Sequence, residues 1–131
     1  MDQASRDAHA VMERAHKESI RVPVDEQAAF VQDVVGSRLA AAALGLKDTR
    51  TLSSWAGGGP IRGADAQHRL QVLFRVVAAL EEAFSPAVAA AFLRGSNPVL
   101  GDQAPLVVLA DEPPVRAEPR LLQAVAAFLT A

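Results

Sequence analysis

Apolar residues recur at the spacing of amphipathic helices along most of the chain. The strongest pattern covers residues 65–84. One apolar row consists of Leu70, Leu73, Phe74, Val77, Leu80 and Phe84, and the row beside it of Val72, Val76, Ala79 and Ala83. A helix that is apolar over most of its circumference lies at the centre of a domain or at a subunit interface. The pattern therefore predicts a central or interface helix, and we expect a homo-oligomer formed through it.

Weaker patterns precede this helix. Residues 4–19 carry a sparse apolar stripe, which predicts a marginal helix or a frayed arm. Asp25 is placed to cap a helix over residues 26–35, and Ser37 is placed to cap a short helix over residues 37–44. We expect these segments to add small apolar faces to the core.

A second short helix is predicted after a tight turn that contains Gly45. Asp48 or Thr49 can cap it, and a run of three glycines followed by proline ends it. Leu52 and Trp55 are three residues apart, so they lie on one face of this helix. Two short helices joined by a tight turn are the pattern of a helix-turn-helix.

The C-terminal part of the chain predicts three further helical segments. Ser85 as cap and Pro86 at the first position start a helix that stops at Gly95. In the turn after it, the Asn97 side chain can bond the turn's own backbone, and Pro98 fixes the exit direction. Residues 105–109 fit a buried strand by their β-branching, but the helical context and the leading proline favour a short helix. The three prolines of residues 111–119 predict a linker, and an amphipathic helix follows it.

These elements together predict an all-α fold. The chain has no cysteine, which excludes a disulfide framework, a thiolate zinc site and a cysteine nucleophile, and which suits a reducing cytoplasm. No apolar stretch approaches the roughly 20 residues of a membrane span, and the charged start of the chain has no signal-peptide pattern. We expect a cytoplasmic protein that does not enter a membrane.

The formal net charge of −2 conceals an uneven distribution. Residues 36–75 carry six basic and two acidic side chains. Residues 1–35 carry four basic and seven acidic side chains, and residues 76–131 carry three and six. A basic centre between acidic flanks suits a short DNA-contacting module within a protein-binding protein. Chance clustering of solvated charge is an equal alternative.

The sequence offers no arrangement of residues suited to catalysis or metal binding. His9 and His16 are seven residues apart, with no third ligand nearby. Glu81 and Glu82 are adjacent and therefore point in different directions around a helix. The glycine run lacks the Lys-Ser/Thr pair of a phosphate-binding loop. We expect no enzymatic activity, no metal site and no cofactor.

The second helix of the helix-turn-helix pattern is the candidate DNA-contacting element. Arginine and small hydroxyl side chains on its outer face can contact phosphates or base edges. Leu46 and Leu52 are one residue farther apart than is common in bacterial proteins of this kind, so ordinary solvent-facing residues are an equal alternative. The candidate DNA-contacting residues are Lys47, Thr49, Arg50, Ser53, Ser54 and Arg62.

The segment Phe92-Leu93-Arg94-Gly95-Ser96-Asn97-Pro98-Val99-Leu100-Gly101, followed by Ala104-Pro105-Leu106 and Leu109, is the most specific part of the sequence. It resembles the toxin-binding domain of Xre/MbcA/ParS-like antitoxins. Leu44-Gly45-Leu46 and Thr51-Leu52-x-x-Trp55 also resemble the Xre-type half of these proteins, so the resemblance covers about residues 35–131. Val107-Val108 departs from the polar residue usual in the family, and the predicted proline-rich linker is longer than usual.

The resemblance implies a non-catalytic antitoxin that binds a RES-domain toxin, an enzyme that destroys NAD, and covers its substrate pocket. It also implies repression of the antitoxin's own operon through operator DNA, and a toxin–antitoxin hetero-oligomer. We expect the last helix to reach towards the toxin's pocket because the predicted linker lets it move. The candidate toxin-binding residues are Arg94, Asn97, Pro98, Arg120, Leu121, Leu122, Val125, Phe128 and Leu129.

Three regions follow from this interpretation: residues 1–24 as an N-terminal arm or marginal helix, residues 25–84 as the Xre-like helical region, and residues 85–131 as the toxin-binding region. The alternative is a helix-turn-helix transcriptional regulator whose C-terminal domain only dimerises. The charge distribution suits both functions.

Overall fold

The computed structural model describes residues 3–131, and this part of the chain is all-helical. Met1 and Asp2, at the start of the predicted N-terminal arm, lie outside the described residues. No strand occurs among residues 3–131, where a single bridge pairs Asn97 with Gln103. The helices are α1 (Gln3–Arg21), α2 (Val24–Val35), α3 (Ser37–Ala43), α4 (Thr49–Ala56), α5 (Ala64–Ala83), α6 (Pro86–Arg94), the 3-10 turn η1 (Pro98–Leu100), α7 (Pro105–Asp111) and α8 (Pro114–Leu129).

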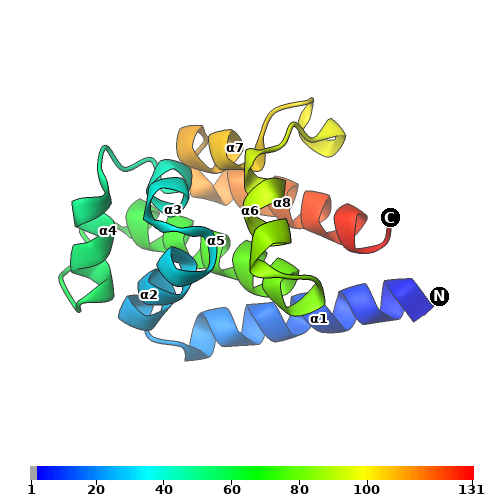
Figure 1. The fold of residues 1–131 in the computed structure, drawn as a ribbon, viewed down its shortest axis with the longest axis horizontal. Coiled ribbons are helices and arrows are strands. Elements are labelled where there is room, and N and C mark those ends of the chain that lie inside the picture. The colour runs from blue at the N-terminus through cyan, green and yellow to red at the C-terminus, as the bar shows by residue number, and fades with distance from the viewer. Residues whose placement is uncertain (1–2) are drawn as a thin grey trace.

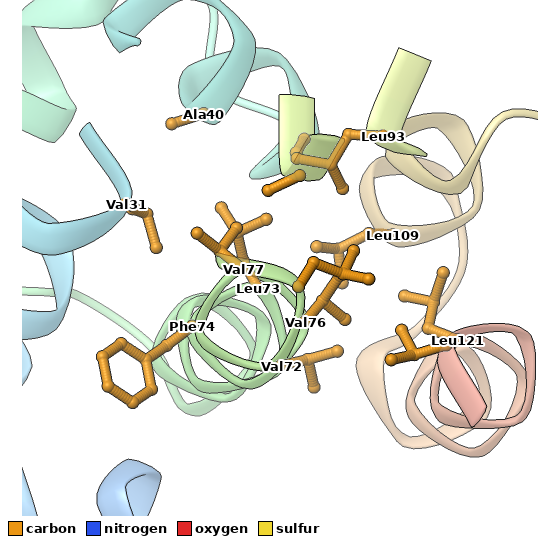
Figure 2. Close-up of a cluster of buried hydrophobic side chains, with 14 of the residues drawn as sticks. Val31, Ala40, Val72, Leu73, Phe74, Val76, Val77, Leu93, Leu109 and Leu121 are labelled. Carbon is orange, nitrogen blue, oxygen red and sulfur yellow. The ribbon is translucent and has the colours of Figure 1, made fainter. Parts of the chain in front are cut away.

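Helix α5 lies at the centre and the other helices surround it (Figure 1). Side chains radiate from α5 towards Val31 of α2, Leu93 of α6, Leu109 of α7 and Leu121 of α8 (Figure 2). Both of its predicted apolar rows are buried as far as Leu80, which confirms the central position, whereas Ala83 at the end of the second row is exposed. The same burial contradicts a homo-oligomer formed through this helix, because helices of the same chain already cover both rows. Phe84, placed in one row by the sequence, lies just beyond α5 and is 50% exposed.

Of the two predictions for the N-terminal segment, the structure has the helix and not the frayed arm. Residues Gln3–Arg21 form a helix of 19 residues that packs along α5. Ala8, Val11 and Ala15 are buried in this contact, and the small alanines let the two helices approach closely. The sparse apolar stripe is therefore sufficient, because a large partner helix is present. Residues from the three predicted regions share one hydrophobic cluster.

Two of the predicted helix caps are wrong and two are confirmed. Pro23 and Gly36 occupy the N-cap positions of α2 and α3, and neither helix has a side-chain capping bond. Asp25 and Ser37 therefore lie inside the first turns. Asp48 caps α4 by accepting from the backbone N–H groups of Arg50 and Thr51, and Ser85 caps α6.

The predicted linker over residues 111–119 is also wrong. Helix α7 ends at Asp111, and α8 begins at Pro114, where proline suits the first helical turn. Pro119 lies inside α8, so the helix lacks the bond from this position to the carbonyl of Val115. Val115 is 74% exposed and Pro119 is exposed, so water can solvate that carbonyl. Residues 105–109 belong to a helix, as the context predicts.

Arg69 joins α5 to the end of α7. Its Nε atom donates to the carbonyl of Leu109 at 2.8 Å, and its Nη2 atom donates to the carbonyl of Glu112 at 3.1 Å. We expect Arg69→Met to lower the free energy of unfolding by about 1–3 kcal/mol, because it keeps the aliphatic stem and leaves two carbonyls without their donors. Urea unfolding measures the change. The matched control Arg62→Met replaces an exposed arginine and should change it by less than about 0.5 kcal/mol; equal effects would contradict the joining role of Arg69.

None of the helices formed by residues 3–131 combines the length and the apolar character needed to cross a membrane.

Candidate functional site

A groove of about 450 Å³ lies between α6, the turn that follows it and the last turn of α8. We name it the Asn97 groove. In Figure 1 this turn, drawn in yellow, and the C-terminus lie at one end of the molecule, and α4 lies at the other end. The groove is lined by Val88, Ala91, Phe92, Gly95, Ser96, Asn97, Pro98 and Phe128.

Hydrogen bonds hold the turn beside the groove in one conformation. The side-chain Oδ1 of Asn97 accepts from the backbone N–H of Val99 at 3.0 Å. The backbone of Asn97 donates to Gln103 at 3.1 Å and accepts from Leu100 and Asp102 at 3.0 and 2.9 Å. Leu100 is fully buried, and its 3-10 turn packs against α8. The predicted turn role of Asn97 is confirmed, and the turn is fixed to the core as well.

Aromatic rings from three segments meet at the same end of the molecule. Phe128 makes edge-to-face contacts with Phe92 and with Phe84, at centroid distances of 5.3 and 5.4 Å. Phe128 and Phe84 are 38% and 50% exposed. Phe84 and Leu129 also line a second hollow of about 290 Å³ against α1. Adjacent exposed apolar side chains of this size are typical of a protein-binding surface.

Three of the predicted toxin-binding residues line the Asn97 groove: Asn97, Pro98 and Phe128. Leu121 and Val125 do not, because their side chains are 1% and 0% exposed and belong to the core around α5. The expectation that the last helix stands free for a partner is therefore wrong. Helix α8 is part of the core, and only its final turn borders the groove.

The other predicted toxin-binding residues do not line the groove. Arg94 is exposed on the last turn of α6. Leu129 lines the second hollow, and Leu122 is half-buried. Arg120 donates to the carboxylate of Glu112 and thereby ties α8 to the end of α7. Arg120 therefore has a structural bond that the sequence did not indicate.

Five lining residues are not among the candidate toxin-binding residues: Val88, Ala91, Phe92, Gly95 and Ser96. Of these, Val88, Ala91 and Phe92 follow the i, i+3, i+4 spacing of one helix face, which is a visible signal. That spacing does not distinguish a face covered by the core from a face left open. Phe84 was assigned to the core for the same reason, although it lies beyond the last residue of α5.

A second groove, of about 620 Å³, lies between α4 and the segment that follows it. We name it the Arg50 groove. Of the predicted DNA-contacting residues, it brings together Arg50, Ser54 and Arg62, with Trp55 also in its lining. The remaining three lie apart from it. Lys47 and Thr49 line a neighbouring hollow, and Ser53 is exposed without lining either.

The basic centre of the sequence is divided between the surface and the interior. Arg69 donates to the carbonyls at the end of α7. Arg75 donates to the carboxylate of Glu118 in α8 at 3.4 Å, and His68 lies 3.5 Å from the same carboxylate. The other four basic side chains of residues 36–75 are exposed or border the α3–α4 surface. The basic surface is therefore smaller than the charge count suggests.

The carboxylate of Asp48, which caps α4, makes the stability of this helix depend on pH. The backbone N–H of Thr51 and the side chain of Arg50 donate to its carboxylate and lower the pKa of Asp48 from its ordinary value of 3.8. A lowered folded-state pKa contributes stability that is fully present above the unfolded pKa. It is lost as pH falls through the folded pKa. Asp48 therefore stabilises α4 at neutral pH and ceases to do so in strong acid.

Asp48→Asn isolates this contribution, because asparagine caps a helix but does not titrate. We expect the wild type to exceed the variant in melting temperature by more at about pH 7 than at about pH 2. Circular dichroism melts at the two pH values measure the difference. A gap that is the same at both pH values would contradict the charged cap.

Within residues 3–131, no three histidine, aspartate or glutamate side chains are close enough together to hold a metal ion. Comparison of the chain with protein-family models, with curated proteins and with solved structures finds no match. The family resemblance consequently rests on the residues of the motif.

Proposed function

We propose that this protein is an antitoxin that binds a RES-domain toxin through the Asn97 groove and the aromatic residues beside it. The observation that carries the proposal is the position of the Asn97-Pro98 turn. The motif with the family resemblance lies against Phe128, whose ring also contacts the exposed Phe84. A rigid turn beside partly exposed aromatic side chains is the kind of surface that contributes strongly to protein–protein binding.

The chemistry of the groove supports binding rather than catalysis. None of the residues that line it is ionisable, and its polar groups come from one asparagine, one serine and the backbone. General acid–base and nucleophilic mechanisms need a titratable or activated side chain at the reacting atom. In the proposed function the protein inhibits by covering the toxin's substrate pocket and takes no part in a reaction.

A second candidate function is favoured by the Arg50 groove. Two arginines and two hydroxyl side chains border it, and such side chains bind DNA phosphates. Under this alternative the protein is a transcriptional regulator whose C-terminal part only dimerises. The two functions are also compatible in one molecule, because no residue lines both grooves and α4 lies far from the C-terminal end of α8 (Figure 1). An antitoxin that also represses its own operon would use both.

The proposal predicts that a neighbouring gene encodes a RES-domain protein, and co-expression with that protein tests it. We expect the two proteins to copurify and the cellular NAD concentration to be maintained, whereas the toxin alone should deplete it. A double Arg50→Ala, Arg62→Ala variant should still protect NAD. Its binding to operator DNA should weaken, and the slope of the logarithm of the binding constant against the logarithm of the salt concentration should decrease in magnitude by up to about two.

Loss of NAD despite the presence of the wild-type protein would refute the antitoxin function. In that case, DNA binding by the wild type at low salt would support the alternative function, a transcriptional regulator. No DNA binding at low salt would remove the DNA role from both candidate functions.

A further inference from the structure

The Asn97 groove is uncharged over its whole lining. An ionised side chain that entered it would lose its hydration and gain no opposite charge, which is costly. An apolar side chain would gain by burial against Phe92 and Phe128, whose rings already contact each other edge to face. Charge complementarity therefore indicates an uncharged, apolar occupant.

The size of the groove indicates what kind of segment fits. Its volume of about 450 Å³ lies within the range of sites that enclose a small ligand, roughly 300–1,000 Å³. A helix bound in a groove would instead contact the surface with several side chains along two turns or more. The lining of the Asn97 groove comes from α6, the turn after it and one residue of α8. This arrangement suits a single large side chain.

Asn97 supplies a polar contact at one side of the groove. Its Oδ1 atom is occupied by the backbone N–H of Val99. Its Nδ2 group donates to no residue within 3–131, so both of its hydrogens are available to a partner. A main-chain carbonyl next to an inserted side chain is the acceptor that this amide suits, because it adds a hydrogen bond without adding charge.

Helix α8 is not the occupant. Leu121, Ala124 and Val125 hold it in the core, and its final turn is part of the groove lining. A second copy could offer Ile20 or Val115, the most exposed large apolar side chains among residues 3–131, but neither lines the groove. Their insertion would join different surfaces of successive copies, and such contacts generally build open chains or larger rings. A different protein is therefore the better source of the occupant.

We propose that the Asn97 groove receives one uncharged aromatic or large aliphatic side chain of the toxin, with the adjacent main-chain carbonyl bound by the Asn97 side chain. This inference rests on the proposed antitoxin function. It reverses the direction of insertion expected from the sequence, in which the last helix of this chain enters the toxin. The structure favours the reversal because α8 is fixed to α5 and the groove is open.

Nuclear magnetic resonance of the full chain labelled with 15N tests the pocket without the toxin. The probes are N-acetyl-phenylalaninamide and, as a charged counterpart, N-acetyl-lysinamide. We expect the phenylalanine derivative to shift the backbone signals of Ala91, Gly95 and Ser96 and the side-chain amide signal of Asn97. The lysine derivative should leave these signals in place at the same concentration.

Two alanines of α6 give a matched pair of variants. Ala91 lines the groove and Ala87 is exposed on the same helix without lining it. Ala91→Leu should fill the groove and weaken binding of the phenylalanine derivative at least about tenfold, whereas Ala87→Leu should not change it. Equal effects of the two variants, shifts confined to the Arg50 groove, or equal shifts with the lysine derivative would overturn the proposal.

The same variants give a decisive result with the toxin. Ala91→Leu should bind the toxin about thirtyfold more weakly than Ala87→Leu does. A loss of this size is typical when a hot-spot contact of an interface is blocked. If the toxin binds both variants equally, the insertion is wrong and the antitoxin function stands. If it binds neither variant nor the wild type, the antitoxin function fails, and the inferred toxin contact fails with it.

Discussion

Deletion of residues 119–131 is expected to unfold the protein, although the sequence predicts that a folded domain remains. The deleted segment contains Leu121, Ala124 and Val125, which are buried against α5. Replacing a single buried leucine by alanine costs about 2–5 kcal/mol. Loss of the whole helical segment exceeds this several-fold, and domains of this size are stable by only about 5–15 kcal/mol. Far-UV circular dichroism should show a large loss of helix and no cooperative melting transition.

A shorter deletion serves as the control. Thr130 and Ala131 are exposed and follow the last residue of α8, so their removal should leave the melting temperature nearly unchanged. A cooperative transition in the protein that lacks residues 119–131 would contradict the placement of α8 in the core. It would support the mobile tail that the proline-rich segment suggests.

Phe128→Asp is expected to abolish most of the affinity for the toxin while the protein remains folded. Phe128 is 38% exposed in the last turn of α8, so its loss removes two aromatic contacts and little of the core. The new carboxylate would stand in an uncharged groove, where a bound partner would strip its water. We expect the dissociation constant to rise about a hundredfold or more. Isothermal titration calorimetry with the RES-domain toxin measures it.

Val115→Asp is the matched control for this variant. It makes the same change of charge on the same helix, at a position that is 74% exposed and outside the groove. We expect its affinity for the toxin to equal that of the wild type within about twofold, because an exposed residue outside an interface contributes little to binding. Comparable losses in both variants would indicate a general charge effect and would contradict a role for the Asn97 groove.

The parts of the fold that the sequence predicted are those specified by local chemistry. Asp48 and Ser85 cap their helices because each directly precedes the helix and accepts from backbone N–H groups of its first turn. Asn97 forms its turn through its own side chain, which needs no distant partner. The two apolar rows of α5 predicted a central helix because a helix that is buried on several sides carries apolar residues around most of its circumference.

The wrong predictions concern segments whose structure depends on tertiary packing. Helix α1 is stable because α5 lies beside Ala8 and Ala15, a partner that the sparse stripe does not reveal. Helix α8 starts at Pro114 and tolerates Pro119, although clustered prolines indicate a linker in isolation. Predicting the linker led directly to the prediction of a mobile last helix. Once α8 is fixed, Leu121 and Val125 become core residues instead of partner contacts.

The candidate site could be predicted in position but not in shape. The motif around Asn97 indicated the correct part of the chain, because a turn and its flanking helix are contiguous in sequence. The groove also needs Phe128 and the neighbouring Phe84, which come from two other segments. Their exposure depends on where α5 and α8 end relative to α6, and a periodic pattern does not contain that information.

Amide hydrogen exchange of the protein, alone and bound to the RES-domain toxin, tests the central claim most directly. Binding at the Asn97 groove should slow exchange in residues 88–99 and in the last turn of α8, where the backbone borders the groove. Exchange in α4 and the segment after it, at the other end of the molecule, should remain unchanged. Protection confined to α4, or no protection of residues 88–99 in a complex that does form, would contradict the account.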